Sequence, residues 1–346
     1  MKKLMILLLL ICVFSPMVSA NEFIAPNAPP DVEKYVPDSP GSFAADLWYV
    51  FKAATGDLQP HIKDAAGTCV CLIAVSLLIS ILHNLPSAGG QVTSLVSAIV
   101  VSLLLIQPAN SMIALGVETV ESLSQYGKLL LPVMSSAMAA QGAVTTSAAL
   151  YTGTAIFIAI LTAAIKDVIV PLVYIYLVLS LAHSAVENEM LINLRSFIKW
   201  LLTWSLKIAI YLFTGYLGIT GVISGTADAA AIKATKLAFS GLVPIVGKVI
   251  SDASETVLVS AGVMKNAVGN YGMLAIAAIY ISPFLQIGMQ YLMLKITASV
   301  CSIFGNKNSV GLIKDFTTTL GYLLAATGTV CILLLVSTVC FMKGVS

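Results

Sequence analysis

Apolar blocks of roughly twenty residues, the length a helix needs to cross a bilayer, follow one another from Cys69 to Met342. No other feature of the chain constrains its fold as strongly. Only 10% of the residues are charged and the mean hydropathy is +0.97, whereas a water-soluble surface needs far more charge. Because backbone groups in lipid must pair within the protein, such blocks fold as helices. The sequence therefore predicts an all-α, polytopic transmembrane helical bundle.

Residues 1–20 have the three parts of a secretory signal peptide. A basic start, an apolar run and a small-residue cleavage site follow one another: Lys2-Lys3, Leu4–Val13 and Val18-Ser19-Ala20. The short apolar run and Pro16 favour cleavage, and an uncleaved N-terminal anchor is the alternative. In both cases we expect residues 21–65 to lie outside the cytoplasm.

The segment 21–65 changes character along its length. It begins with a Pro-rich stretch, which is typical of an extended and mobile chain. From Phe43 onward apolar and aromatic residues recur at helical spacing: Phe43, Leu47, Trp48, Tyr49, Val50 and Phe51. This pattern predicts a short amphipathic helix on the membrane surface, with its rings at headgroup level. A loosely packed linker is the alternative.

The transmembrane domain is predicted at 66–346, and its order of elements occurs twice. When the chain is shifted against itself, Pro132 falls on Pro244 and Pro171 on Pro283. We therefore expect two parallel repeats at about 91–198 and 199–315, followed by a final span. Proline removes a backbone donor, so Pro108, Pro171 and Pro283 are expected to kink or break helices, and Pro132 and Pro244 to begin them.

Basic residues indicate the orientation of the spans. Arg195, Lys199 and Lys207 crowd one loop and the adjoining span end, and Lys307 and Lys314 mark a second loop. The positive-inside rule places both loops in the cytoplasm. Counting spans from an outside N-terminus agrees with this if the blocks 129–150 and 242–265 each cross fully, and the C-terminal tail then lies outside, against which Lys343 argues mildly.

The block 242–265 has the length of a span yet carries several charges. Lys248, Asp252 and Glu255 are spaced i, i+4 and i+7, which puts them on one helical face. A charge at the bilayer centre costs at least about 2.5 kcal/mol, so this face avoids lipid. Either the helix crosses with these candidate pathway-lining residues facing a polar interior, or the block lies at the surface or re-enters without crossing.

A second charged interruption, Lys166-Asp167, separates two apolar helices at 151–165 and 168–185. Adjacent residues of opposite charge suit a tight turn at a membrane surface. We therefore expect a turn here, and a buried ion pair is the alternative.

The sequence offers no catalytic, cofactor-binding or metal-binding motif. It lacks a phosphate-cradling Gly-rich loop that ends in Lys-Ser or Lys-Thr, so the chain has no obvious ATPase of its own. Its three histidines are widely separated, and its 18 basic and 16 acidic residues nearly balance, which gives no sign of a nucleic-acid surface. We expect the protein not to be an enzyme.

The tract from Tyr216 to Gly272 resembles the stage III sporulation protein AE family of endospore-forming bacteria. The likeness lies in Leu242-Val243-Pro244-Ile245-Val246-Gly247, in Ser251-Asp252 and in Lys265-Asn266-Ala267-Val268-Gly269. It extends over nearly the whole mature chain and is weakest in 21–60. These are not catalytic motifs, so the resemblance carries no active-site roles.

The resemblance implies a role in sporulation. Members of this family belong to a mother-cell membrane complex in the outer membrane around the forespore. With a forespore-side partner, that complex is thought to form a secretion-like channel, or feeding tube, that supports late forespore gene expression. The AE protein is viewed as a permease-like subunit beside other membrane proteins, a separate ATPase and ring-forming subunits. From the residues alone, an autonomous secondary transporter for a small solute is the alternative, and an intramembrane enzyme is a third class.

Overall fold

Every element in the described part of the chain is a helix, which confirms the predicted all-α, polytopic bundle. The computed structural model describes residues 25–37, 42–83, 90–186, 188–211, 215, 246–304 and 307–343, with backbone alone for 83, 90–91 and 246–265. Its helices are α2 (Pro30–Glu33), α3 (Phe43–Gly56), α4 (Gln59–His83), α5 (Gly90–Ala140), α6 (Val144–Ala164), the π-helical turn η1 (Ile165–Ile169), α7 (Val170–Val186), a helical segment at 189–211, α9 (Val246–Phe304) and α10 (Lys307–Lys343). Five helices in this part are long and apolar enough to cross a membrane. The predicted signal peptide lies outside the described residues.

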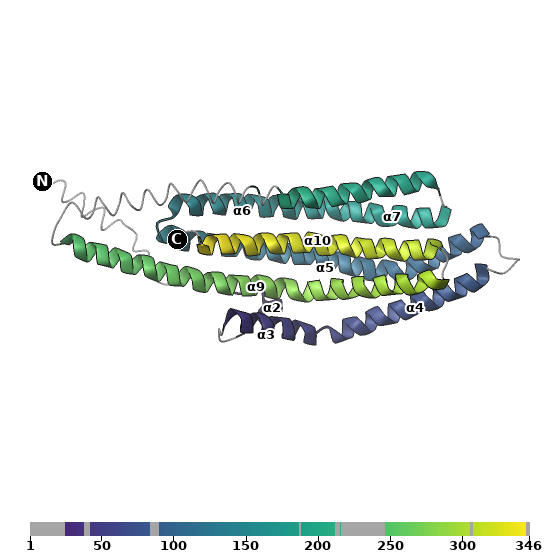
Figure 1. Cartoon of the computed structure of the whole chain (residues 1–346), viewed down its shortest axis with the longest axis horizontal. Helices are drawn as coiled ribbons and strands as arrows, with labels where there is room; N and C mark the ends of the chain where they lie inside the picture. Colours follow the sequence, from purple (N-terminus) through teal and green to yellow (C-terminus); the bar gives the residue numbers. More distant parts are fainter. Residues whose placement is uncertain are drawn as a thin grey trace.

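The long helices lie side by side and alternate in direction, and α10 lies at the centre of the bundle (Figure 1). It packs against α9, α5, α7 and α6, while α9 also contacts α5, α4 and α3. Buried aliphatic residues run along most of α10, from Leu312 and Ile313 to Leu334 and Phe341. The last helix of the chain is therefore the core around which the others assemble.

Small and hydroxyl-bearing residues let these helices approach closely. Gly116 and Gly127 of α5 lie against Leu323 and Leu334 of α10, and a Cβ at Gly127 would crowd Leu334 at 2.7 Å. The buried threonines and serines of α10 bond back to their own helix; for example, Thr327 Oγ1 donates to the Leu323 carbonyl at 2.9 Å. Buried hydroxyl groups of α10 thus have a partner within their own helix.

Two helices are longer than the sequence predicts, so the chain does not break at Pro108 or Pro283, and the helix start expected at Pro132 is wrong. The 51 residues of α5 pass through Pro108 and Pro132, and the 59 residues of α9 pass through Pro283. At 1.5 Å per residue α9 is about 88 Å long, well beyond the ~30 Å hydrocarbon core of a bilayer. From residue 246 onward the predicted block 242–265 is therefore part of one helix that continues through Pro283 to Phe304. Proline is tolerated because neighbouring helices offset the lost backbone bond.

The turn predicted at Lys166-Asp167 is also wrong, because the two residues lie in η1 within one continuous helical path from α6 to α7. The Val170 N–H donates to the Ile165 carbonyl, five residues earlier, which widens the helix locally. Pro171 follows directly, and its ring would otherwise meet the carbonyl four residues back. A π-helical turn thus accommodates both the proline and the charged pair.

Residues 25–37, expected to be extended and mobile, instead pack on the bundle. Ala28, Tyr35 and Val36 are buried, and the Tyr126 hydroxyl donates to the Pro26 carbonyl at 3.3 Å. Lys34 Nζ lies 2.6 Å from Asp57 Oδ2, and the Tyr35 hydroxyl donates to the same oxygen at 2.7 Å. The hydrogen bond from Lys34 lowers the pKa of Asp57 below its ordinary range, and the bond to Asp57 raises the pKa of Lys34.

The predicted amphipathic segment forms α3, which packs on α9 through Val50 and Ala54. Its opposite side exposes Trp48 and Tyr49, and the Trp48 ring stacks on that of Phe51 at 5.7 Å. The location of this aromatic side at a membrane surface stays a prediction, as do the two parallel repeats.

Candidate functional site

The outward side of α5 changes from apolar to polar along one helix. Its first half exposes Val92, Leu95, Ile99, Leu103 and Ile106. Beyond Ile106, residues at the same helical spacing of three and four form what we call the polar face: Gln107, Ser111, Glu118, Glu121, Gln125 and Lys128. All six are exposed or half-exposed. The polar face is therefore an outer surface of the bundle and not part of its core.

The middle of the polar face lies level with the middle of the uncharged run of α10. Gly116 lies against Leu323 and Thr327 of α10, and Gly127 lies against Leu334. Glu118 and Glu121 come between these two glycines. No charged residue occurs in α10 between Asp315 and Lys343, so the two carboxylates lie far from either charged end of that helix.

An ion pair joins the polar face to η1. Lys166 Nζ contacts Glu121 Oε1, and the two side chains are 41% and 40% exposed. The π-helical turn and α5 thus hold two opposite charges together on the outside of the bundle. Sequence reasoning missed this pair because the partners are 45 positions apart and Lys166 has a more obvious neighbour in Asp167.

Other sides of the bundle expose aliphatic residues at the depth of Gly127, about 9 Å along α5 from Glu121, because Gly127 lies against Ile158 of α6 and Leu334 of α10. Ile156 and Ile160 are exposed on α6, and Ile332 and Val336 on α10. Lipid chains can pack against these aliphatic sides. Against the polar face, lipid chains would leave half-exposed charges unsolvated, at a cost of several kcal/mol. The polar face is therefore suited to contact water or another protein.

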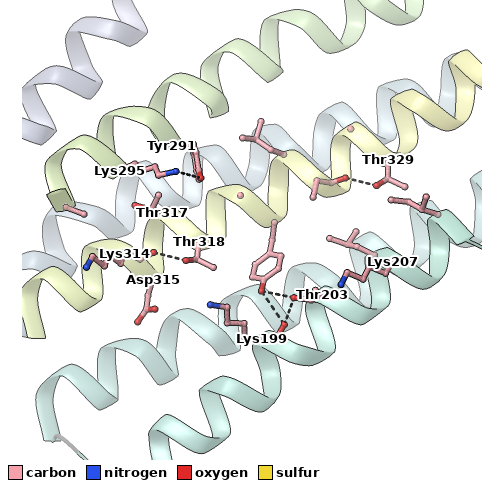
Figure 2. A pocket seen from close by; sticks show the side chains of 18 of the residues that line it. Lys199, Thr203, Lys207, Tyr291, Lys295, Lys314, Asp315, Thr317, Thr318 and Thr329 are labelled. Carbon is pink, nitrogen blue, oxygen red and sulfur yellow. Dashed lines mark hydrogen bonds between the residues drawn. The ribbon is translucent and has the colours of Figure 1, made fainter.

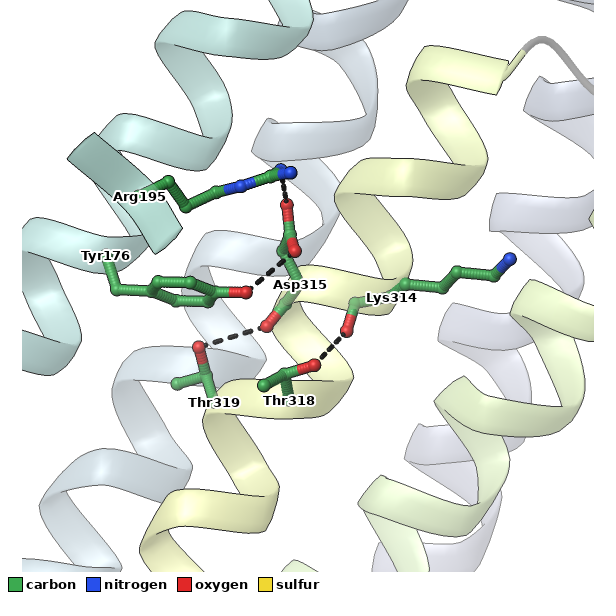
Figure 3. Close-up of polar contacts among 6 residues, drawn as sticks. All are labelled: Tyr176, Arg195, Lys314, Asp315, Thr318 and Thr319. Carbon is green, nitrogen blue, oxygen red and sulfur yellow. Dashed lines mark hydrogen bonds and ion pairs between the residues drawn. The ribbon is translucent and has the colours of Figure 1, made fainter. Parts of the chain in front are cut away.

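A second polar cluster ties three helices together near the start of α10 (Figure 3). Asp315 of α10 accepts a hydrogen bond from the Tyr176 hydroxyl of α7 at 2.8 Å. Its other oxygen lies 2.5 Å from Arg195 of the segment 189–211. The Asp315 side chain is 12% exposed and that of Arg195 is 23% exposed. In the sequence, Arg195 was identified only as a charge in a loop, and its ion pair was missed. The signal for that pair was an opposite charge, Asp315, beside the other predicted cytoplasmic loop.

Next to this cluster an open groove of about 1120 Å³ runs along α10, between the segment 189–211 and α9 (Figure 2). Four lysines line it: Lys199, Lys207, Lys295 and Lys314. Tyr322 of α10 lies between the two sides, and its hydroxyl donates to the Lys199 carbonyl at 3.2 Å. The basic residues of both predicted cytoplasmic loops thus meet at one end of the bundle, and their cytoplasmic location stays a prediction.

The candidate pathway-lining residues Lys248, Asp252 and Glu255 lie in the helical backbone of α9, so their spacing does place them on one helical face. Their side chains lie outside the described part of the structure. Gly269 packs against Met342 near the end of α10, and α9 continues past that end (Figure 1). These three residues are therefore separate from the polar face and the groove, and a pathway role for them stays a prediction.

The comparisons with known proteins bear on the whole chain. The model of the family described as stage III sporulation protein AE matches residues 31–344. This chain belongs to the stage III sporulation protein AE family. A curated relative, the stage III sporulation protein AE of Bacillus subtilis (strain 168), is 20% identical over 275 residues, which cover 78% of this chain and 68% of the relative. No solved structure matches.

Family membership confirms the resemblance read from residues 216–272. Together with the five apolar helices, it makes this chain a multi-pass membrane protein of sporulation. Among the described residues, no three histidine, cysteine or acidic side chains lie together as a metal site would require. The polar face, the Asp315 cluster and the groove are thus the features from which a function can be argued.

Proposed function

We propose that this protein is a subunit of a multiprotein, secretion-like channel that links the mother cell and the forespore during sporulation. It resides in the mother-cell-derived outer membrane around the forespore and acts as a permease-like component needed for late forespore gene expression. Its partners are other membrane proteins of the stage III complex, a separate ATPase and ring-forming subunits, and it is not itself an enzyme. Family membership supports the sporulation setting.

The observation that carries the proposal is the polar face. A protein that worked alone in lipid would expose aliphatic side chains over its whole lipid-facing surface, as α6 does at Ile156 and Ile160. The half-exposed pair Glu121–Lys166 lies about 9 Å further along α5 from the level of these residues and is disfavoured against lipid chains. A neighbouring subunit or a shared aqueous path satisfies these groups, and both require an assembly.

Leucine substitution of the polar face tests this proposal in sporulating cells. In a Glu118→Leu/Gln125→Leu variant, the exposed positions become compatible with lipid, and Glu121–Lys166 stays intact. We expect normal membrane insertion, loss of co-purification with other stage III membrane proteins, and a sharp fall in heat-resistant spores. The control variant Ile156→Leu/Ile160→Leu introduces the same side chain on the aliphatic side and should behave as the wild type.

Normal spores and an intact complex from the polar-face variant would contradict the assignment of this face to an assembly. The chain reconstituted alone in vesicles provides a second measurement. A subunit should show no solute flux by itself, whereas substrate-dependent flux would favour the autonomous transporter.

A further inference from the structure

The groove along α10 holds more positive charge than its surroundings balance. Lys199, Lys207, Lys295 and Lys314 are all exposed, and among the described residues none of them forms an ion pair with a carboxylate. Asp315, the carboxylate that also lines the groove, is already engaged by Arg195. The unbalanced lysines indicate an anionic ligand.

Three of the lysines gather toward one end of the groove. Lys295 Nζ lies 3.4 Å from the Tyr291 hydroxyl, and Tyr291 lies against Gly321 of α10. The backbone of Lys199 contacts α10 next to Gly321, because its carbonyl accepts from the Tyr322 hydroxyl. Lys314 precedes Tyr322 by about two turns of α10. Figure 2 shows the three side chains on three different helices, Lys199 on the segment 189–211, Lys295 on α9 and Lys314 on α10.

The groove is mostly apolar away from this basic end. Leu206, Leu324, Ala325 and Ile332 line it there, and Lys207 and Thr329 are polar residues of this part. Ile332 lies about 27 Å along α10 from Lys314. One leaflet of hydrocarbon is about 15 Å deep, half of a ~30 Å core. The groove is thus long enough for a charged headgroup at the lysines and an acyl chain along the aliphatic residues.

A small free anion would leave the aliphatic part of the groove uncovered, whereas a phospholipid satisfies both parts. Basic pockets between transmembrane helices on the cytoplasmic side are known to take anionic headgroups. We propose that this groove binds an anionic phospholipid, with its phosphate at Lys199, Lys295 and Lys314 and one acyl chain along α10. This site is independent of the polar face and of the proposed channel.

Lipid retention by the purified full chain tests the site. Native mass spectrometry with added phosphatidylglycerol should show a tightly held lipid that phosphatidylcholine does not replace. Each lysine near a headgroup contributes about fivefold in affinity, so Lys295→Gln/Lys314→Gln should weaken phosphatidylglycerol binding roughly 30-fold. The control Lys52→Gln/Lys63→Gln makes the same change in net charge outside the groove and should bind as the wild type does.

Three outcomes would overturn the proposal: equal weakening in both variants, displacement of the lipid by millimolar inorganic phosphate, or equal retention of phosphatidylcholine. Circular dichroism should show unchanged helical content, so that loss of binding is not loss of fold. A second measurement leaves the lysines in place and puts photoreactive benzoylphenylalanine at Thr318 in the groove. It should yield a phosphatidylglycerol adduct, whereas a crosslink to another part of the chain would show that protein fills the groove.

Discussion

Replacing Asp315 by Asn removes the charge at the centre of the cluster that joins α7, α10 and the segment 189–211. Asn keeps an oxygen that can accept from the Tyr176 hydroxyl, but it leaves the Arg195 guanidinium without its counter-charge. Removing one partner of a fully buried pair costs about 3–5 kcal/mol, and a hydrogen bond to a charged group contributes about 1.5–3 kcal/mol. Because Arg195 is 23% exposed and can still reach water, we expect a loss of about 2–3 kcal/mol.

The free energy of unfolding can be measured in mixed micelles by circular dichroism as the fraction of denaturing detergent rises. Tyr176→Phe removes one hydrogen bond and keeps the ion pair, so it should cost about 1.5 kcal/mol. Arg195→Gln should cost about as much as Asp315→Asn. In the double variant Asp315→Asn/Arg195→Gln neither charge is stranded, so the loss should fall short of the sum by at least about 1 kcal/mol.

Two results would refute the reasoning. One is Asp315→Asn within about 0.5 kcal/mol of the wild type, the size of an ordinary surface substitution. The other is full additivity in the double variant, which would show that the two side chains do not interact in the folded protein.

Two further predictions concern packing and pH. Gly272→Val should cost about 1–3 kcal/mol of unfolding free energy in the same assay, because a Cβ there would lie 2.8 Å from Leu130; Gly288→Val is the control, since that position has nothing within 4 Å. The pKa of Asp57 is lowered by Lys34, so its contribution to the docking of residues 30–36 should be present above pH 3.8 and lost as the pH falls further. Protease sensitivity of that segment should rise in acid, and Asp57→Asn should abolish the pH dependence.

Hydropathy alone was enough to predict the class of fold, because a bilayer leaves so few ways to satisfy a backbone. It was not enough to place the ends of the helices. Pro108 and Pro283 remove backbone donors, yet the cost is offset by helices packed alongside, which a single sequence does not show. The charged pair at Lys166 was misread for a similar reason, since its true partner, Glu121, comes from another helix.

The polar face was within reach of sequence reasoning. Glu118, Glu121 and Lys128 are charges within a largely apolar stretch of the sequence, and their spacing with Gln107, Ser111 and Gln125 follows the helical period. The signal that was missed is the change along one side of α5, from aliphatic residues before Gln107 to polar ones after it. The groove was out of reach, because its lysines come from three helices whose packing no local pattern encodes.

The central position of α10 has a consequence for biosynthesis. The ribosome makes α10 after α5, α6, α7 and α9, yet all four pack against it. Until α10 has been made, these helices lack the partner on which their inner faces pack. The bundle therefore completes its packing only after α10 has been inserted, and the earlier helices stay in the membrane without their central contact until then.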